Sequence, residues 1–266
     1  MGMRPGDTVL VMGVVNVTPD SFSDGGQFLD PAAAIAHGRQ LIADGADLLD
    51  IGGEATNPRA KPVAADDELR RVLPVIEGLA ALRTGTRLSI DTTKASVARA
   101  AVAAGATIIN DVSGGLFDPA MAEAVAETGA TYIAGHLRGR SLAEVFAAEA
   151  SIPWRDVAAE LAGRVAALPS SVRERVWVDP GVGFGKGADP EGNFELLRHA
   201  GDIGRAVGCP VVVGPSRKRF LRQTDPAALD AASVRACLDA VRAGAFVVRV
   251  HNVALLRTAL TAYNKE

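Results

Sequence analysis

The chain has 266 residues, a formal net charge of -3 at pH 7 and a hydrophobic content of 48%. This composition allows a sizeable core, and the absence of a basic surplus argues against a nucleic-acid-binding protein. The first apolar run, Val9–Val15, is too short to span a bilayer, and no charged segment and apolar stretch typical of a signal peptide precede it. These features predict a cytoplasmic globular protein without a membrane partner.

Short β-branched runs alternate with alanine-rich helical stretches along the whole chain. The predicted strands are Val9–Val15, Asp47–Ile51, Arg87–Asp91, Thr107–Asn110, Thr131–Ala134, Val176–Asp179, Pro210–Gly214 and Phe246–Val250. The predicted helices are Pro31–Asp44, Asp66–Leu82, Lys94–Ala104, Pro119–Thr128, Trp154–Leu168, Pro226–Ala243 and Val253–Tyr263, with a further piece around Asn193–Val207. The strands are continuous apolar runs, which is typical of parallel strands covered on both faces.

Eight strand-then-helix units in about 250 residues predict an α/β fold, a (β/α)8 TIM barrel. A doubly wound open sheet is the alternative, because periodicity alone does not show that a sheet closes. No Pro-, Gly- or Ser-rich linker divides the chain, so one domain is expected over residues 1–266.

Polar residues stand at the end of every predicted strand or shortly after it. They are Asn16, Glu54, Asp91, Asn110, His136, Asp179, Lys218, Arg249 and His251. In a barrel, the carboxyl ends of all eight strands open on one mouth, where active sites lie. The pattern therefore predicts that residues far apart in the sequence meet in one site.

The chemical types in this ring indicate two kinds of ligand group. Asp91, Asn110 and Asp179 suit a flat heterocycle with an amino-amide edge, whereas Lys218, Arg249 and His251 suit a phosphorylated group. As an alternative for the carboxylates, Asp91 and Asp179 neutralise Lys218 and an arginine. As an alternative for the basic run 217–219, its side chains form a solvated face, although the run directly follows a buried strand.

The glycine-rich segment Gly181–Gly187 resembles a phosphate-binding loop but fails its pattern. Position 180, where the first glycine of that motif would stand, is Pro180, and Gly187 follows the lysine where Ser or Thr is required. No GxSxG nucleophile motif is present in the sequence.

Seven segments together resemble the dihydropteroate synthase family, folate-pathway enzymes that join a pterin pyrophosphate to para-aminobenzoate. They occur in order over nearly the whole chain. They are Asn16–Gly26, Asp50–Glu54, Ser89–Thr92, Ile109–Gly115, Asp179–Lys186, Ser216–Lys218 and Arg249–His251. The (β/α)8 fold of that family agrees with the barrel expected from the strand pattern.

The resemblance implies a role for each matching position. It places the pterin against Asp91, Asn110, Asp179, Phe184 and Lys218, and the pyrophosphate against Asn16, Arg249 and His251. It implies that Asn16 also binds Mg²⁺. The arylamine pocket would contain Thr56, Asn57, Pro58, Ser216 and Arg219.

The reaction implied by the resemblance is a displacement in which pyrophosphate leaves the pterin methylene before the arylamine nitrogen attacks. Asp24, Asp91 and Lys218 are the expected catalytic residues. Asp24 belongs to one mobile loop and Thr56 to another, and closure of both loops would exclude water. Mg²⁺ and the cations would stabilise the leaving group. The family also implies a homodimer through the last helices.

Five positions depart from the usual residues of the family. They are Arg219 for Ser, Asn57 for Arg, Pro215 for Thr or Ser, Gly135 for Met and Asn252 for Asp. Most lie where the arylamine should dock, which predicts a reshaped pocket and an altered response to sulfonamides. Two alternatives stay open: a catalytically silent pterin-binding sensor, and a pterin-dependent methyltransferase domain. The latter does not need the segments Ser216–Lys218 and Arg249–His251.

Overall fold

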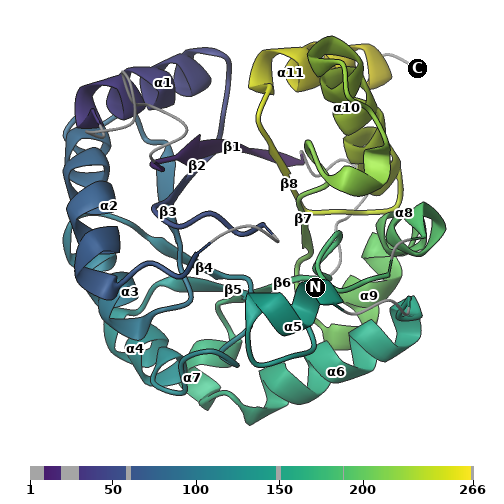
Figure 1. The fold of residues 1–266 in the computed structure, drawn as a ribbon, viewed down its shortest axis with the longest axis horizontal. Helices are drawn as coiled ribbons and strands as arrows, with labels where there is room; N and C mark the ends of the chain where they lie inside the picture. Colours follow the sequence, from purple (N-terminus) through teal and green to yellow (C-terminus); the bar gives the residue numbers. More distant parts are fainter. Residues whose placement is uncertain (1–8, 19–29, 58–60, 148–150, 188, 265–266) are drawn as a thin grey trace.

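The computed structural model describes residues 9–18, 30–57, 61–147, 151–187 and 189–264. Two residues expected in the site, Asp24 and Pro58, lie outside these ranges. In the described part of the chain, eight parallel strands form a nearly closed ring surrounded by helices (Figure 1). The strands are β1 (Leu10–Asn16), β2 (Leu48–Gly52), β3 (Arg87–Asp91), β4 (Ile108–Asp111), β5 (Thr131–Gly135), β6 (Val176–Asp179), β7 (Val212–Val213) and β8 (Val247–Val250).

The helices follow the strands in the expected alternation, with additional short ones. They are α1 (Pro31–Ala43), α2 (Ala65–Ala80), α3 (Ala95–Ala103), α4 (Met121–Thr128), α5 (Leu142–Ala147), α6 (Trp154–Ala167), α7 (Ser170–Arg173), α8 (Pro190–Arg198), α9 (Ala200–Val207), η1 (Arg219–Leu221, a 3-10 helix), α10 (Pro226–Arg242) and α11 (Val253–Tyr263). None of the helices in the described ranges is both long and apolar enough to cross a membrane.

The strand order is β6-β5-β4-β3-β2-β1-β8-β7, and every neighbouring pair is parallel. One isolated parallel bridge between Val178 and Val211 joins the two ends of this order and closes the ring. The TIM barrel is therefore confirmed, and the open doubly wound sheet is wrong. The seventh strand is shorter than the predicted Pro210–Gly214, and at its start Pro210 has no N–H to donate to a neighbouring strand.

Local sequence signals explain where several helices begin. Asp30, Asp189 and Asp225 each precede a proline, and each carboxylate accepts a hydrogen bond from a backbone N–H in the first turn. The predicted piece Asn193–Val207 is two helices, α8 and α9, which meet at His199. Helices α5 and α7 and the 3-10 helix were not predicted, because segments of three to six residues carry little periodicity.

The alternation of side chains along each strand separates two cores. One set of positions packs outward against the helices, and the other fills the barrel interior with Met12, Leu48, Ile108, Ile133, Val212 and Val247. Two residues further along their strands, and therefore on the same inner face, lie Asp50, Asn110 and Arg249. The strands thus build a polar layer directly above an apolar one.

Candidate active site

A cavity of about 740 Å³ opens at the carboxyl ends of the strands. All of the expected site residues that the structure describes line it: Asn16, Thr56, Asn57, Asp91, Asn110, Asp179, Phe184, Ser216, Lys218, Arg219, Arg249 and His251. The prediction that the strand ends meet in one site is therefore confirmed for this part of the chain. His136 does not line the cavity, and its buried ring instead contacts Glu160 on α6.

The floor of the cavity holds an ion-pair network centred on Arg249. Its Nε donates to Asp50 Oδ2 at 2.5 Å, and its Nη2 donates to Asp91 Oδ2 at 2.9 Å. Asn110 Nδ2 donates to the same Asp50 oxygen at 2.9 Å. Asp50 is fully buried, and it is a site residue that the sequence analysis missed. Its place within a buried strand, two residues before the strand ends, was the available signal.

Asp91 is held near the midpoint of its titration. Burial raises the pKa of Asp91, the nearby Asp50 carboxylate adds to this, Arg249 opposes both, and the resulting pKa is about 7. At neutral pH the carboxyl group therefore exists in both protonation states, so it can donate or accept a hydrogen bond. The alternative that Asp91 neutralises an arginine is confirmed by the Arg249 pair. Asp179 forms no ion pair among the described residues, and its carboxylate accepts from the Gly181 N–H at 2.7 Å.

The three cations of the run 217–219 point to different surroundings. Arg217 pairs with Asp230 at 2.8 Å, and Arg219 lies with its guanidinium 5.7 Å from the Phe146 ring centre. Lys218 turns into the cavity, where its Nζ donates to the Val182 carbonyl and lies 4.3 Å from the Phe184 ring centre. Burial lowers the pKa of Lys218 to about 8, opposed by the charge of Asp179. The solvated-face alternative is therefore wrong for Lys218.

His251 is a neutral side chain in this site. Burial, together with the charges of Arg249 and Arg217, lowers the pKa of its imidazole to about 3. Ser216 Oγ lies 3.0 Å from its Nδ1 and also accepts from the His251 backbone N–H at 3.2 Å. The ring therefore contributes hydrogen bonds rather than positive charge to the group of donors expected for a phosphorylated ligand.

One rim of the cavity is formed by the segment after β2 and by α5. Thr56 and Asn57 line the cavity beside Glu54, whose carboxylate is held by Lys94. From the other direction α5 brings Phe146 to within 5.7 Å of the Phe184 ring, centre to centre. Phe146 was missed by sequence reasoning because α5 has only six residues and no motif marks it.

Two of the departures from the family pattern have structural reasons. A Cβ at Gly135 would lie 2.4 Å from the Val112 carbonyl oxygen, so no side chain fits on this backbone. Asn252 caps α11 through the Leu255 N–H and also donates to Asp230 at 3.0 Å. Nothing in the structure explains Pro215.

The chemistry of the donors fits a Mg²⁺ ion that is held mainly by substrate. Asn16 lines the cavity at the end of β1 and offers an amide oxygen, a ligand type that Mg²⁺ accepts. Mg²⁺ commonly keeps several waters and binds substrate phosphates beside few protein ligands. The described residues contain no cluster of three or more His, Cys, Asp or Glu side chains suited to a metal.

Residues 12–251 match the family model described as "Pterin binding enzyme". The chain is 43% identical to the dihydropteroate synthase of Mycobacterium leprae (strain TN) over 260 residues, covering 92% of this chain and 89% of that protein. The chain also matches a bifunctional mitochondrial folate synthesis protein from Arabidopsis thaliana. The match covers 47% of that protein, about half of its length.

The fold comparison agrees. A structure of the Xanthomonas albilineans dihydropteroate synthase with 4-aminobenzoic acid matches with a TM-score of 0.87 and 43% identity, over 97% of this chain and 93% of that one. A structure of the same enzyme with 7,8-dihydropteroate matches with a TM-score of 0.84 and 42% identity, over 97% and 94% of the two chains. These relatives are synthases, in agreement with the main interpretation and not with the sensor or the methyltransferase. The chain therefore belongs to the dihydropteroate synthase family of pterin-binding transferases.

Proposed function

We propose that this cavity condenses 6-hydroxymethyl-7,8-dihydropterin pyrophosphate with para-aminobenzoate to give 7,8-dihydropteroate and pyrophosphate. The observation that carries the proposal is the layout of the cavity. A carboxylate and amide set (Asp91, Asn110, Asp179) lies beside the cations Lys218 and Arg249, at the ends of five different strands or the loops that follow them. A substrate with a hydrogen-bonding heterocycle at one end and a diphosphate at the other matches both halves.

In the pterin half, Asp91, Asn110 and Asp179 receive the edge of the heterocycle, and Phe184 and Lys218 flank its ring. Asp91 suits this task because a pKa of about 7 lets its carboxyl group accept from a ring N–H as the anion or donate as the acid. Asn110 is fixed by its bond to Asp50, so its amide is already oriented before the ligand arrives.

In the diphosphate half, Arg249, His251 and Asn16 surround the leaving group. When the pterin takes the Asp91 carboxylate, the Arg249 Nη2 that now donates to it becomes available to a phosphate oxygen. His251, as a neutral ring whose Nδ1 lies beside Ser216, donates through Nε2. Asn16 would hold Mg²⁺ together with the diphosphate, and the ion when bound supplies positive charge for the departing oxygens.

The chemical step breaks the bond between the pterin methylene carbon and the diphosphate oxygen. The electron pair leaves with the diphosphate, and Lys218 and Arg249 stabilise the charge that develops there. The arylamine nitrogen then forms the new bond to the methylene carbon and loses a proton, which the released diphosphate takes up. Asp24, Asp91 and Lys218 are the proposed catalytic residues, and the segments with Asp24 and Thr56 exclude water from the reacting carbon.

The arylamine pocket comprises Thr56, Asn57, Pro58, Ser216 and Arg219. Arg219 is exposed and rests on Phe146, so its guanidinium is free to bind the carboxylate of para-aminobenzoate instead of filling the pocket. Residues 1–266 act as one domain in the cytoplasm. It forms a homodimer through its last helices, α10 and α11.

Equilibrium binding separates the two halves of the site. Titration calorimetry would compare 6-hydroxymethyl-7,8-dihydropterin with inorganic pyrophosphate and Mg²⁺, on wild type, Asn110→Ala and Arg249→Met. The pterin should lose at least tenfold in affinity with Asn110→Ala, whereas pyrophosphate should lose more with Arg249→Met. Equal losses of both ligands in both variants would contradict the assignment of separate subsites.

A further inference from the structure

Lys186, at the edge of the cavity, is a buried lysine that the proposed mechanism does not use, and burial lowers the pKa of its amino group to about 7. Only 2% of the residue is exposed, yet it belongs to the cavity lining. Its Nζ donates to the His136 carbonyl at 3.1 Å and to the Phe184 carbonyl at 2.9 Å. No carboxylate among the described residues lies within ion-pair distance of it. A buried charge is costly unless it is fully hydrogen-bonded, so a lysine with carbonyl partners alone needs a reason.

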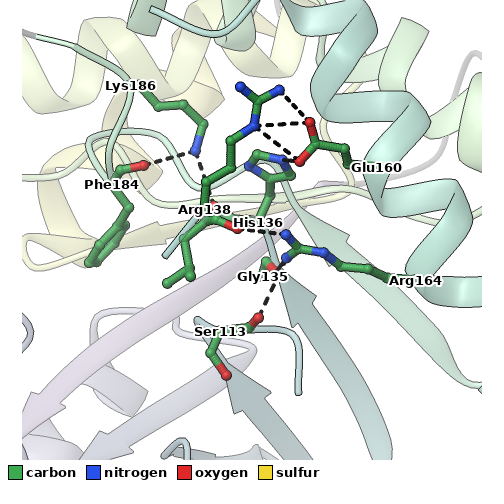
Figure 2. Close-up of polar contacts among 9 residues, drawn as sticks. Ser113, Gly135, His136, Arg138, Glu160, Arg164, Phe184 and Lys186 are labelled. Atoms are coloured by element: carbon green, nitrogen blue, oxygen red, sulfur yellow. Dashed lines mark hydrogen bonds and ion pairs between the residues drawn. The ribbon is translucent and has the colours of Figure 1, made fainter. Parts of the chain in front are cut away.

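The first partner of Lys186 is the His136 carbonyl, in the segment that directly follows β5 and is also held by Arg164. Arg164, from α6, donates to the Gly135 carbonyl at 3.1 Å (Figure 2). It also donates to the Leu137 carbonyl at 2.5 Å. Lys186 takes the carbonyl between them, that of His136. Because successive carbonyls of an extended chain point to opposite sides, the side chains of Arg164 and Lys186 hold this segment from both sides. The position of the His136 carbonyl is therefore fixed by the fold.

The second partner belongs to the loop Gly181–Gly187, which packs tightly around two lysines. A Cβ at Gly181 would lie 1.9 Å from the His136 oxygen and 3.0 Å from Lys186 Nζ. A Cβ at Gly183 would lie 2.7 Å from Lys218 Cδ. The loop can approach both side chains because glycine occupies these two positions, each at a positive φ.

We infer that Lys186 is a positioning residue for Phe184 and Lys218. Its ammonium group ties the loop that carries Phe184 to the clamped end of β5. The same loop supplies the two groups that Lys218 contacts, the Val182 carbonyl and the Phe184 ring. Lys186 thus sets the place of the aromatic ring and the cation on which the proposed pterin site depends, without touching the substrate. The inference rests on the proposed roles of Phe184 and Lys218.

Chemical rescue tests this inference. Lys186→Ala opens a space beside the cavity in which a small alkylammonium ion can bind to the two carbonyls. Lys186→Met fills that space without a donor and serves as its matched partner. Arg70→Met, which removes an exposed cation from α2, is the control for loss of positive charge. The readouts are the dissociation constant for 6-hydroxymethyl-7,8-dihydropterin and kcat/KM, with the melting temperature of each variant.

The inference predicts at least a tenfold weaker pterin affinity and lower kcat/KM in both Lys186 variants, and no such change in Arg70→Met. Ethylammonium should restore Lys186→Ala severalfold, whereas ethanol should not, and Lys186→Met should not respond. Folded variants within twofold of wild type would overturn the inference. So would a loss that neither ion nor alcohol restores, because it would indicate a role in packing alone.

If Lys186→Ala does not fold, Lys186→Arg, which keeps donors, should bind pterin more tightly than Lys186→Met, and equal affinities would overturn the inference. Pterin binding is measurable even if wild type shows no turnover, so failure of the proposed reaction would be seen separately.

Discussion

Arg249→Met is the substitution that most directly disturbs the floor of the cavity. The arginine is the shared ion-pair partner of Asp50, whose side chain is fully buried, and of Asp91, whose side chain is 17% exposed. Methionine has a similar volume but no charge, so both carboxyl groups lose their cation while the packing is largely kept.

The magnitude depends on which carboxyl group can take up a proton. Removing one partner of a buried ion pair costs about 3–5 kcal/mol of folding free energy. Asp91 already has a pKa of about 7, so it becomes neutral at little cost, and the unpaired charge falls mainly on Asp50. The lower end of the range, about 3 kcal/mol at pH 8, is therefore expected. In a chain of this length it corresponds to a melting temperature roughly 6–12 °C lower.

The destabilisation caused by Arg249→Met should depend on pH with a definite sign. Loss of Arg249 raises the pKa of Asp91 further above its unfolded value, so between pH 8 and 6 the folded variant binds more protons there than folded wild type, whose Asp91 has a pKa of about 7, while the unfolded chains bind none. The destabilisation should therefore shrink as the pH falls. Calorimetric melting of wild type and variant at pH 8, 7 and 6 measures this, with Arg70→Met, an exposed ion pair, as a control expected to cost below about 1 kcal/mol. A loss below about 1 kcal/mol for Arg249→Met, or one that grows at low pH, would refute the reasoning.

Three further predictions concern other cavity residues. Lys218→Met should lower kcat/KM about 10- to 100-fold, because a charged hydrogen bond contributes about 1.5–3 kcal/mol; steady-state kinetics within twofold of wild type would exclude its role. The pKa of His251 is lowered to about 3 from 6.5, so the unfolded chain binds a proton there that the folded chain does not, and stability falls as the pH drops below 6.5. Between pH 7 and pH 5 the free energy of unfolding of His251→Gln, measured with urea, should therefore fall by roughly 2 kcal/mol less than that of wild type. The same pH dependence in both proteins would count against a neutral His251. Arg219→Ser should weaken para-aminobenzoate binding about 2- to 30-fold, since a charge-assisted hydrogen bond is replaced by a neutral one. The binding of an uncharged sulfonamide should weaken less. Tighter binding of para-aminobenzoate would mean that Arg219 obstructs the pocket.

The sequence predicted most of the barrel because its signals are local. The runs that became β3 and β6 were predicted with their observed bounds, Arg87–Asp91 and Val176–Asp179, since each is flanked by turn or helix residues. The polar residues at the strand ends were found for the same reason. The seventh strand was predicted too long because the pairing of Pro210 and Gly214 depends on their neighbours in the sheet.

The parts of the site that were missed depend on contacts between distant segments. Asp50 lies within an apolar run, and only its bonds to Asn110 and Arg249 reveal a role. Lys186 was considered only within a rejected phosphate-loop motif and as the end of the matching segment Asp179–Lys186, with no role assigned, whereas its amino group donates to a carbonyl 50 residues earlier. Phe146 joins the cavity because a six-residue helix packs against the loop after β6, which no local pattern encodes.

The central claim is most directly tested by turnover of the wild-type chain with 6-hydroxymethyl-7,8-dihydropterin pyrophosphate and Mg²⁺, with and without para-aminobenzoate. Pyrophosphate release and 7,8-dihydropteroate would be measured in the same reaction. The proposed function predicts both products in equal amounts and only when the arylamine is present. Tight pterin binding with no dihydropteroate formed would contradict the claim that this cavity joins the pterin to para-aminobenzoate.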